Sequence, residues 1–226
     1  MKKYYEAYDE RYRSVHAEGL SWTSPAPTPI VREVLESCGI DKTKRILEIG
    51  AGEGRDAFPL LCEGYNLIAS DISPEAVDYC RRQMPKYASR FTVLDAVEGT
   101  HRETYDFIYA VAVIQMLVED SDRAAFLSFI REHLCEGGIA LVCSMGDGIR
   151  THMSDTKAAF DLQRRIHEQS GRELMLAATT CRMVRRETFL EEFDRAGLTV
   201  LSSDVREDVP GFDKMMCALV KRKGKK

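Results

Sequence analysis

An apolar run at residues 45–49 leads directly into three glycines at alternate positions, and this junction limits the possible folds more than any other segment. The stretch reads R-I-L-E-I-G-A-G-E-G-R-D-A, with Gly50, Gly52 and Gly54 in the turn before an expected helix at 55–63. Glycine permits a positive φ in a tight turn, and its missing Cβ lets a ligand approach the backbone closely. The segment therefore predicts a buried strand, a ligand-binding turn and a helix.

Apolar runs and helical stretches alternate along the rest of the chain. Runs typical of buried strands lie at 45–49, 66–70, 91–94, 106–113 and 139–143, and helices are expected at 29–38, 55–63, 74–84, 122–134, 155–170 and 186–196. Strand followed by helix, repeated, favours an α/β, doubly wound fold whose mostly parallel sheet carries helices on both faces. Two last runs, 198–203 and 215–220, predict a closing hairpin.

Size and composition fit a single domain. Its 226 residues, 44% of them hydrophobic, can bury a sizeable core, and a formal net charge of -4 argues against nucleic acid as a partner. The apolar stretch 107–118 is too short to span a membrane, and the N-terminus is too charged for a signal peptide. Seven cysteines without a C-x-x-C pair favour reduced, mostly buried thiols, no metal site and a cytoplasmic location.

Two acidic residues follow expected strands at the same edge of the sheet as the glycines. Asp71 stands 21 residues after Gly50, at the end of the second run, where a carboxylate can accept hydrogen bonds from both hydroxyls of a ribose. Asp95 follows the third run. Because parallel strands present their carboxyl ends at one edge, these positions predict a ligand that contains a nucleoside.

The glycine spacing separates two kinds of nucleoside ligand. A dinucleotide fingerprint, G-x-G-x-x-G, would require a third glycine where this chain has Arg55, and the sequence has neither a Y-x-x-x-K pair nor a G-x-x-x-x-G-K-[ST] phosphate loop. A nicotinamide-dependent oxidoreductase is therefore the weaker alternative. A second alternative is a protein with the same fold but no catalytic activity, either a partner subunit or a protein that binds the cofactor only as a sensor.

The motifs, taken in order along the chain, resemble those of the class I S-adenosylmethionine-dependent methyltransferases over about residues 40 to 145. The matching signals are Glu48, Gly50, Gly52 and Gly54 (E-x-G-x-G-x-G), Asp71 after the second strand, Asp95-Ala96 after the third, Y-D-F-I-Y-A-V-A-V-I-Q-M-L at 105–117, and Gly137-Gly138. Within that class, the strings G-E-G-R-D-A and Y-D-E-R-Y-R resemble the thiopurine and tellurite-resistance type.

This resemblance implies a seven-stranded, Rossmann-like sheet with an antiparallel C-terminal strand, and S-adenosyl-L-methionine as cofactor. The residues that it implies around the cofactor are Glu48, Gly50, Ala51, Gly52, Gly54, Asp71, Ile72, Asp95, Ala96, Ala110, Val111 and Gln115. Asp71 would hold the ribose hydroxyls, Asp95 would face the adenine amino group, and Gln115 would lie near the transferred methyl. For Glu48 the alternative is a buried carboxylate that pairs with nearby backbone, and for Asp71 and Asp95 it is an acidic residue that only ends a strand at a turn.

The remaining parts of the single domain 1–226 are expected on the substrate side. Residues 1–38 would form a helical lid over the core at 40–145, and 146–226 would supply helices and the closing hairpin. The lid carries Tyr4, Tyr5, Tyr8 and Tyr12 at helical spacing, for which ordinary packing is the alternative. Candidate substrate residues are Tyr8, His16, Trp22, Arg150 and His152, for which a plain surface position is the alternative.

The absence of two motifs narrows the range of possible methyl acceptors. The sequence has no [DN]-P-P-[YFW] after the fourth strand, the signature in this superfamily of amino-group methylation on adenine or glutamine. It also has no Pro-Cys pair, which cytosine carbon methylation uses for its thiolate nucleophile. The expected function is therefore in-line transfer of a methyl group to a small molecule, for which an enzyme mainly aligns the two partners and excludes water. The acceptor atom, any general base and the oligomeric state are left open.

Overall fold

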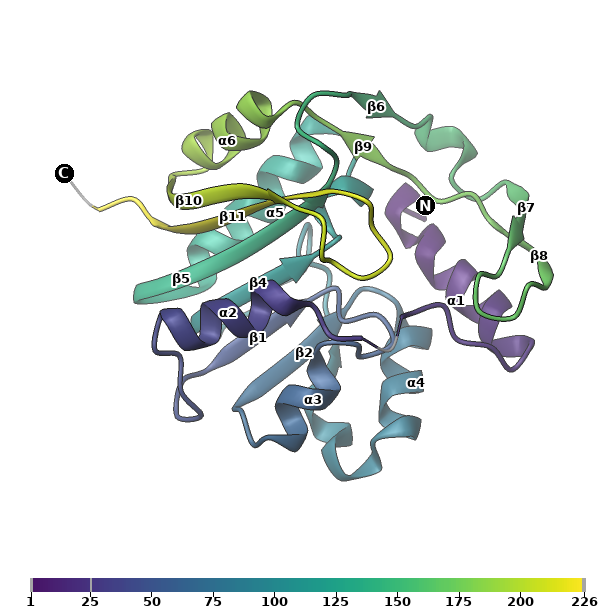
Figure 1. The fold of residues 1–226 in the computed structure, drawn as a ribbon, viewed down its shortest axis with the longest axis horizontal. Helices are drawn as coiled ribbons and strands as arrows, with labels where there is room; N and C mark the ends of the chain where they lie inside the picture. Colours follow the sequence, from purple (N-terminus) through teal and green to yellow (C-terminus); the bar gives the residue numbers. More distant parts are fainter. Residues whose placement is uncertain (1, 25, 225–226) are drawn as a thin grey trace.

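The structure is a computed structural model that describes residues 2–24 and 26–224 (Figure 1). Its elements are η1 Tyr4–Glu6, α1 Ala7–Ala17, α2 Pro29–Ser37, β1 Ile46–Ile49, α3 Ala57–Cys62, β2 Leu67–Asp71, α4 Pro74–Gln83, η2 Pro85–Arg90, β3 Phe91–Val93, β4 Tyr105–Val111, η3 Ile114–Met116, α5 Asp120–His133, β5 Leu134–Met145, β6 His152–Met153, η4 Thr156–Ala158, β7 Leu162–Ile166, β8 Glu173–Ala177, β9 Arg182–Met183, α6 Arg186–Arg195, β10 Leu198–Arg206 and β11 Met215–Arg222. The first residue of the expected lid, Pro25 and the last two residues of the expected domain lie outside the described part.

A seven-stranded sheet with the order β10-β11-β5-β4-β1-β2-β3 forms the centre of the molecule (Figure 1). β1 pairs in parallel with β2 and β4, β2 with β3, and β4 with β5. β11 pairs antiparallel with both β5 and β10. The mostly parallel sheet with one reversed C-terminal strand is thus confirmed, and its central strands are apolar because helices cover both faces.

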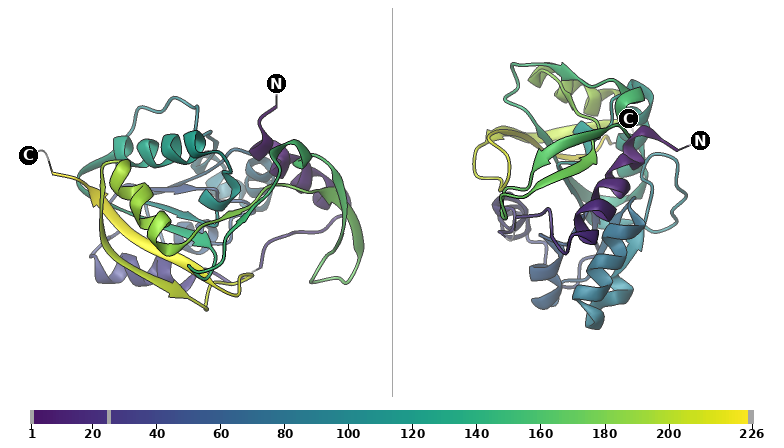
Figure 2. Two further views of the ribbon diagram at one scale, coloured as in Figure 1. Left: turned by 90° about the horizontal axis from the view of Figure 1, so that it is seen from above. Right: turned by 90° about the vertical axis from the view of Figure 1, so that its right-hand side faces the viewer.

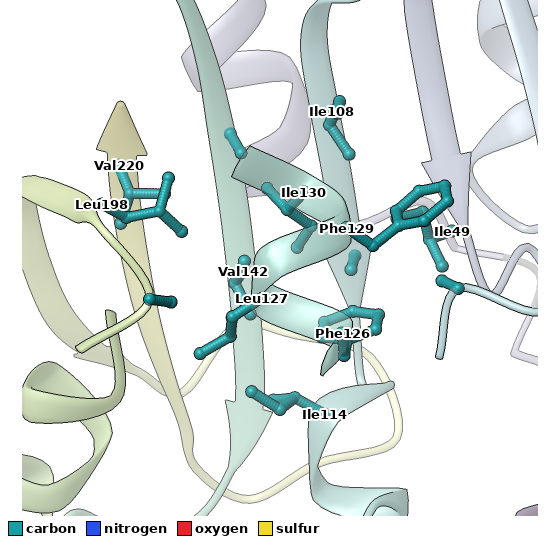
Figure 3. Packing of buried hydrophobic residues seen from close by; sticks show 14 of the residues in the cluster. Ile49, Ile108, Ile114, Phe126, Leu127, Phe129, Ile130, Val142, Leu198 and Val220 are labelled. Carbon is teal, nitrogen blue, oxygen red and sulfur yellow. The ribbon is translucent and has the colours of Figure 1, made fainter. Parts of the chain in front are cut away.

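Helices pack on the two faces of the sheet through separate apolar clusters. On one face, Phe126 and Ile130 of α5 lie over Ile108 of β4 and Val142 of β5 (Figure 3). Buried residues of α2, α3 and α4 pack on the other face. Each cluster removes apolar side chains from water, which is the main force that holds a layered fold together.

Local signals explain where the helices next to the site begin. Ser73 caps α4, since its Oγ accepts a hydrogen bond from Ala76 N at 3.1 Å, and Pro74 occupies the first helical position. Pro29 starts α2 in the same way. As a result α4 begins three residues after the end of β2, which leaves Asp71, the last residue of the strand, close to a helix N-terminus.

The prediction of a helix near 155–170 is wrong. This segment contains only a short 3-10 turn, η4, and the strand β7, which pairs antiparallel with β8. The apolar pair Leu162 and Ile166 is four residues apart, a spacing that places two side chains on one side of a helix and also on one side of a strand. A turn at 167–172 then returns the chain, so 146–185 forms two small antiparallel sheets rather than helices.

The structure also bears on two expectations from composition, the burial of the cysteines and the absence of a membrane-spanning segment. Of the seven cysteines, all in the described part and all free, Cys80, Cys143 and Cys217 are buried, whereas Cys38 and Cys62 are exposed. The expectation of mostly buried thiols is therefore wrong. Among the residues that the structure describes, no helix is both long and apolar enough to cross a membrane.

Candidate functional site

The glycine loop turns sharply at the carboxyl end of β1. The backbone N–H groups of Gly50 and Ala51 both donate to Ser70 O, at 2.8 and 2.9 Å, which holds the loop against β2. Gly50, Gly52 and Gly54 all have φ in the left-handed region, at 77°, 55° and 83°. Since L side chains rarely adopt this conformation, the loop requires glycine at these positions.

Asp71 ties this loop to the end of β2. Its Oδ2 accepts from Gly52 N and its Oδ1 accepts from Ser73 N, both at 2.8 Å, and the residue is only 7% exposed. Burial raises the pKa of Asp71, although the two backbone N–H donors oppose the change. The structure therefore brings Asp71 and the glycines together, as the spacing predicts.

Glu48 lies beneath the loop on β1, directly beside Tyr109 of β4 in the register of the sheet. Glu48 is 4% exposed, and its Oε2 and the Tyr109 hydroxyl have no hydrogen-bond partner among the described residues. Burial raises the pKa of Glu48 well above its usual range. A buried carboxyl oxygen without a hydrogen-bond partner is costly in a protein interior, so Oε2 is left free to accept a further hydrogen bond.

Asp95 and Ala96 follow β3 at the same edge of the sheet. Asp95 Oδ1 accepts from Val97 N at 2.7 Å and from Glu98 N at 3.1 Å, so the carboxylate holds its own turn. Tyr5 of η1 belongs to the apolar cluster that contains Ala96, and Ile72 packs against that cluster. The Tyr5 hydroxyl is buried without a hydrogen-bond partner among the described residues.

The carboxyl end of β4 is strained. Ala112 has a φ of 62°, a left-handed conformation that costs a non-glycine residue about 1 kcal/mol or more. Ala110 and Val111 are buried just before it, and Gln115 Oε1 accepts from Met145 N at 3.3 Å. Strained backbone of this kind concentrates at functional sites, and the sequence carried no signal for it.

Helix α1 lies across the glycine loop, between α4 and the β7–β8 hairpin (Figure 2). A Cβ built on Gly52 would lie 2.7 Å from the Tyr12 hydroxyl oxygen, so Tyr12 directly covers this glycine. Asp9 accepts from Ser73 Oγ at 2.7 Å and from Glu75 N at 3.1 Å. The N-terminal segment is therefore fastened to the same strand end that carries Asp71.

Glu53, inside the loop, is a residue that the sequence reasoning missed. Its carboxylate accepts from His16 Nε2 at 2.8 Å, from Trp22 N at 2.9 Å and from Thr23 N at 2.6 Å. Only its position between two glycines of the motif could have pointed to it. Through Glu53 the loop holds the helix α1 and the segment that follows it.

The expected substrate residues separate into two groups. His16, Trp22 and Tyr8 lie in or beside the segment over the loop, where the Tyr8 hydroxyl donates to Thr180 O at 3.3 Å. Arg150 and His152 are exposed in the segment after β5, and Arg150 pairs with Asp147. The structure thus brings the first three to the site and leaves the last two on the surface.

A surface cavity of about 470 Å³ lies away from the glycine loop. It is lined by Glu168 and by residues 207–213, and none of Gly50, Gly52 and Gly54 contributes to it. The space directly above Gly52 is occupied by the Tyr12 hydroxyl, so no cavity opens at the loop itself among the described residues. A ligand that contacts the loop at Gly52 would therefore displace the end of the Tyr12 side chain.

The chain has the fold of the class I S-adenosylmethionine-dependent methyltransferases, and its core resembles a methyltransferase domain in sequence. Residues 47–140, which carry the loop, Asp71, Asp95 and the end of β4, match the family model described as a methyltransferase domain. A curated relative, a bifunctional methyltransferase from Rickettsia conorii, is 37% identical over 90 residues, 36% of this chain. The chain spans only 17% of the length of that relative.

Solved structures share the fold over nearly the whole chain. The CcbJ methyltransferase from Streptomyces caelestis aligns with a TM-score of 0.73 at 15% identity, covering 97% of this chain and 99% of that one. The 1,6-didemethyltoxoflavin-N1-methyltransferase from Burkholderia thailandensis aligns with a TM-score of 0.70 at 14% identity, covering 96% and 88%. At these identities the likeness shows the fold alone.

Proposed function

We propose that this chain transfers a methyl group from S-adenosylmethionine to a small-molecule acceptor. The observation that carries the proposal is the contact between Asp71 and the N–H of Gly52, which joins an acidic strand end to a glycine loop. A ligand with a ribose and a charged amino acid end fits such an edge, because carboxylates accept from hydroxyls and bare backbone admits close approach. The N-methylation named for the Burkholderia relative makes an amine a reasonable first acceptor to assay.

The residues present fit this cofactor. Gly52 presents bare backbone that a ligand can approach once the Tyr12 hydroxyl moves aside. The buried Tyr5 hydroxyl and Glu48 Oε2, which have no hydrogen-bond partner among the described residues, would lie near the adenine and methionine ends. In this assignment Asp71 holds the ribose, Ile72 flanks the adenine, and Asp95 with Ala96 faces the adenine amino group. Ala110, Val111 and Gln115 lie toward the methionine end.

The chemistry demands alignment more than acid–base catalysis. The cofactor supplies an electrophilic methyl group on a sulfonium, and displacement by the acceptor disperses the positive charge. The side chains of Tyr8 and Tyr12 lie on the site side of α1 and would exclude water, while aromatic faces favour a nearby cation. We therefore assign residues 1–38 to a lid, 40–145 to the cofactor core and 146–226 to the acceptor side.

Methyl transfer from cofactor with a labelled methyl group to a panel of amines, thiols, phenols and carboxylates tests the proposal. We expect label in at least one class, and Asp71→Ala should raise the KM for the cofactor about 10- to 100-fold, since hydrogen bonds to a charged group contribute about 1.5–3 kcal/mol. Asp78→Ala is the control, because Asp78 pairs only with Arg81 on the exposed side of α4. Equal KM values in the two variants would remove Asp71 from the site.

A further inference from the structure

The imidazole of His16 connects three separate parts of the chain. Its Nε2 lies 2.8 Å from Glu53 Oε1 in the glycine loop, and its Nδ1 lies 2.8 Å from Glu75 Oε1 at the start of α4. The ring stacks on Tyr79 with 4.4 Å between centroids and an interplanar angle of 19°. The His16 side chain is 8% exposed and that of Glu53 is 2% exposed, so this bridge is shielded from solvent.

Both ring nitrogens must donate to complete this bridge, because an ionised carboxylate only accepts. Burial lowers the pKa of His16, but the hydrogen bonds to Glu53 and then to Glu75 outweigh it, and the pKa is raised above 6.5. For both Glu53 and Glu75, burial raises the pKa, and the hydrogen bonds, led by that to His16, lower it overall. At pH values below this raised pKa of His16, the bridge is therefore an imidazolium between two carboxylates.

The groups around the ring reinforce this state. The charged and titratable groups that face the imidazole are Glu53 of the loop, Glu75, Tyr79 and Arg82 of α4, and Tyr12 of α1. Arg82 is the one cation in this set. It lies 3.0 Å from Glu75, and its side chain is 57% exposed, so solvent screens its repulsion of the ring.

We propose that His16 is the positioning residue that closes the N-terminal segment over the glycine loop, so that the grip on the cofactor weakens as the pH rises. This inference rests on the proposed function, in which the loop holds S-adenosylmethionine. A group whose pKa is raised in the closed state stabilises that state fully below its ordinary pKa and loses this effect as the pH passes its raised value. Loss of the proton leaves a ring nitrogen facing a carboxylate with no hydrogen between them.

His16 is then unsuited to contact the acceptor, because both of its nitrogens are engaged. It acts through Glu53, which also holds Trp22 N and Thr23 N. Since Glu53 stands between Gly52 and Gly54, opening of the bridge frees the loop and the covering segment together.

The single tryptophan of the chain, Trp22, reports the opening. Acrylamide quenching of its fluorescence, measured without ligand across the pH range, should show a rise through one titration above about pH 6.5 in the wild type. His16→Gln should show high quenching at every pH and no such titration. The control is His167→Gln, because His167 lies 6.2 Å from Trp22 and could itself quench it, and this variant should keep the wild-type titration.

The rate of S-adenosylhomocysteine release, measured by stopped flow, tests whether the His16 bridge affects cofactor binding. Release from the wild type should become about tenfold faster across the titration, and release from His16→Gln should be fast throughout. Glu75→Gln covers the case in which His16→Gln does not fold, and it should move the titration midpoint to lower pH. A wild-type titration that persists in His16→Gln, or an unchanged midpoint in Glu75→Gln, would overturn the inference. If the ligand does not bind at all, the proposed function fails, and the ligand-free titration still decides the role of His16.

Discussion

Gly52→Val should abolish binding of S-adenosylmethionine while the chain remains folded. A Cβ at this position already lies 2.7 Å from the Tyr12 hydroxyl, and the two further methyl groups would occupy the space in which a ligand meets the loop. Forced overpacking of this kind costs about 1–3 kcal/mol, and displacement of the Gly52 N–H also removes a donor from Asp71. We therefore expect affinity, measured by calorimetry, to fall by roughly a hundredfold or more.

The matched control is Gly39→Val. Gly39 has a φ of 64°, close to the 55° of Gly52, but nothing lies within 4 Å of a Cβ built there. Both variants then carry the strain of a left-handed valine, about 1–2 kcal/mol, and Gly52→Val should lose further stability to urea through its clash with Tyr12. Only Gly52→Val should lose the ligand. Normal binding by Gly52→Val would mean that the loop is not the cofactor site.

Glu192→Ala should destabilise the fold by about 3–5 kcal/mol, because it leaves a buried guanidinium without its counter-ion. The Arg123 side chain is 1% exposed, and its Nε and Nη2 donate to the two carboxylate oxygens of Glu192, each at 2.7 Å. Its Nη1 donates to Ile114 O at 2.6 Å. The pair thus joins α5 and α6 to the turn that carries Gln115, and urea unfolding measures its loss.

Glu191→Ala provides the comparison, since Glu191 is the neighbouring residue and pairs with Arg195 on the surface. Both side chains of that pair are more than half exposed, so its loss should change stability by less than about 1 kcal/mol. Replacing both partners of the buried pair, as Arg123→Met with Glu192→Leu, should recover most of the loss. Equal destabilisation by the two alanine variants would show that the buried pair contributes no more to the free energy of unfolding than the exposed pair.

The sheet and the edge that carries the glycines and Asp71 were predictable because they depend on local sequence. Apolar runs such as 45–49 bury on both faces of a parallel sheet, and the glycines with Asp71 mark the edge where the strands end. The prediction of a helix near 155–170 was wrong because the spacing of Leu162 and Ile166 fits a helix and a strand equally well. The pairing of this segment with β8 makes it a strand. The local sequence pattern of 155–170 contains no sign of that pairing.

The contacts around the site were less predictable. The residues that His16 meets, Glu53 and Glu75, are 37 and 59 positions away, so its bridge depends on how α1 packs rather than on any motif. Arg123 looks like an ordinary surface charge on an amphipathic helix until Glu192, 69 residues later, is placed beside it. Such pairs require the tertiary fold before they can be recognised.

Binding of S-adenosylhomocysteine and of NADH to the wild-type chain, compared by thermal shift at saturating concentration, tests the central claim most directly. A ligand at about 100 times its Kd stabilises the folded state by about 2.7 kcal/mol, which raises the Tm of a chain of this size by about 5–10 °C. We expect that shift with S-adenosylhomocysteine and none with NADH. A shift with NADH alone would contradict the assignment of the glycine loop and Asp71 to a methyltransferase cofactor.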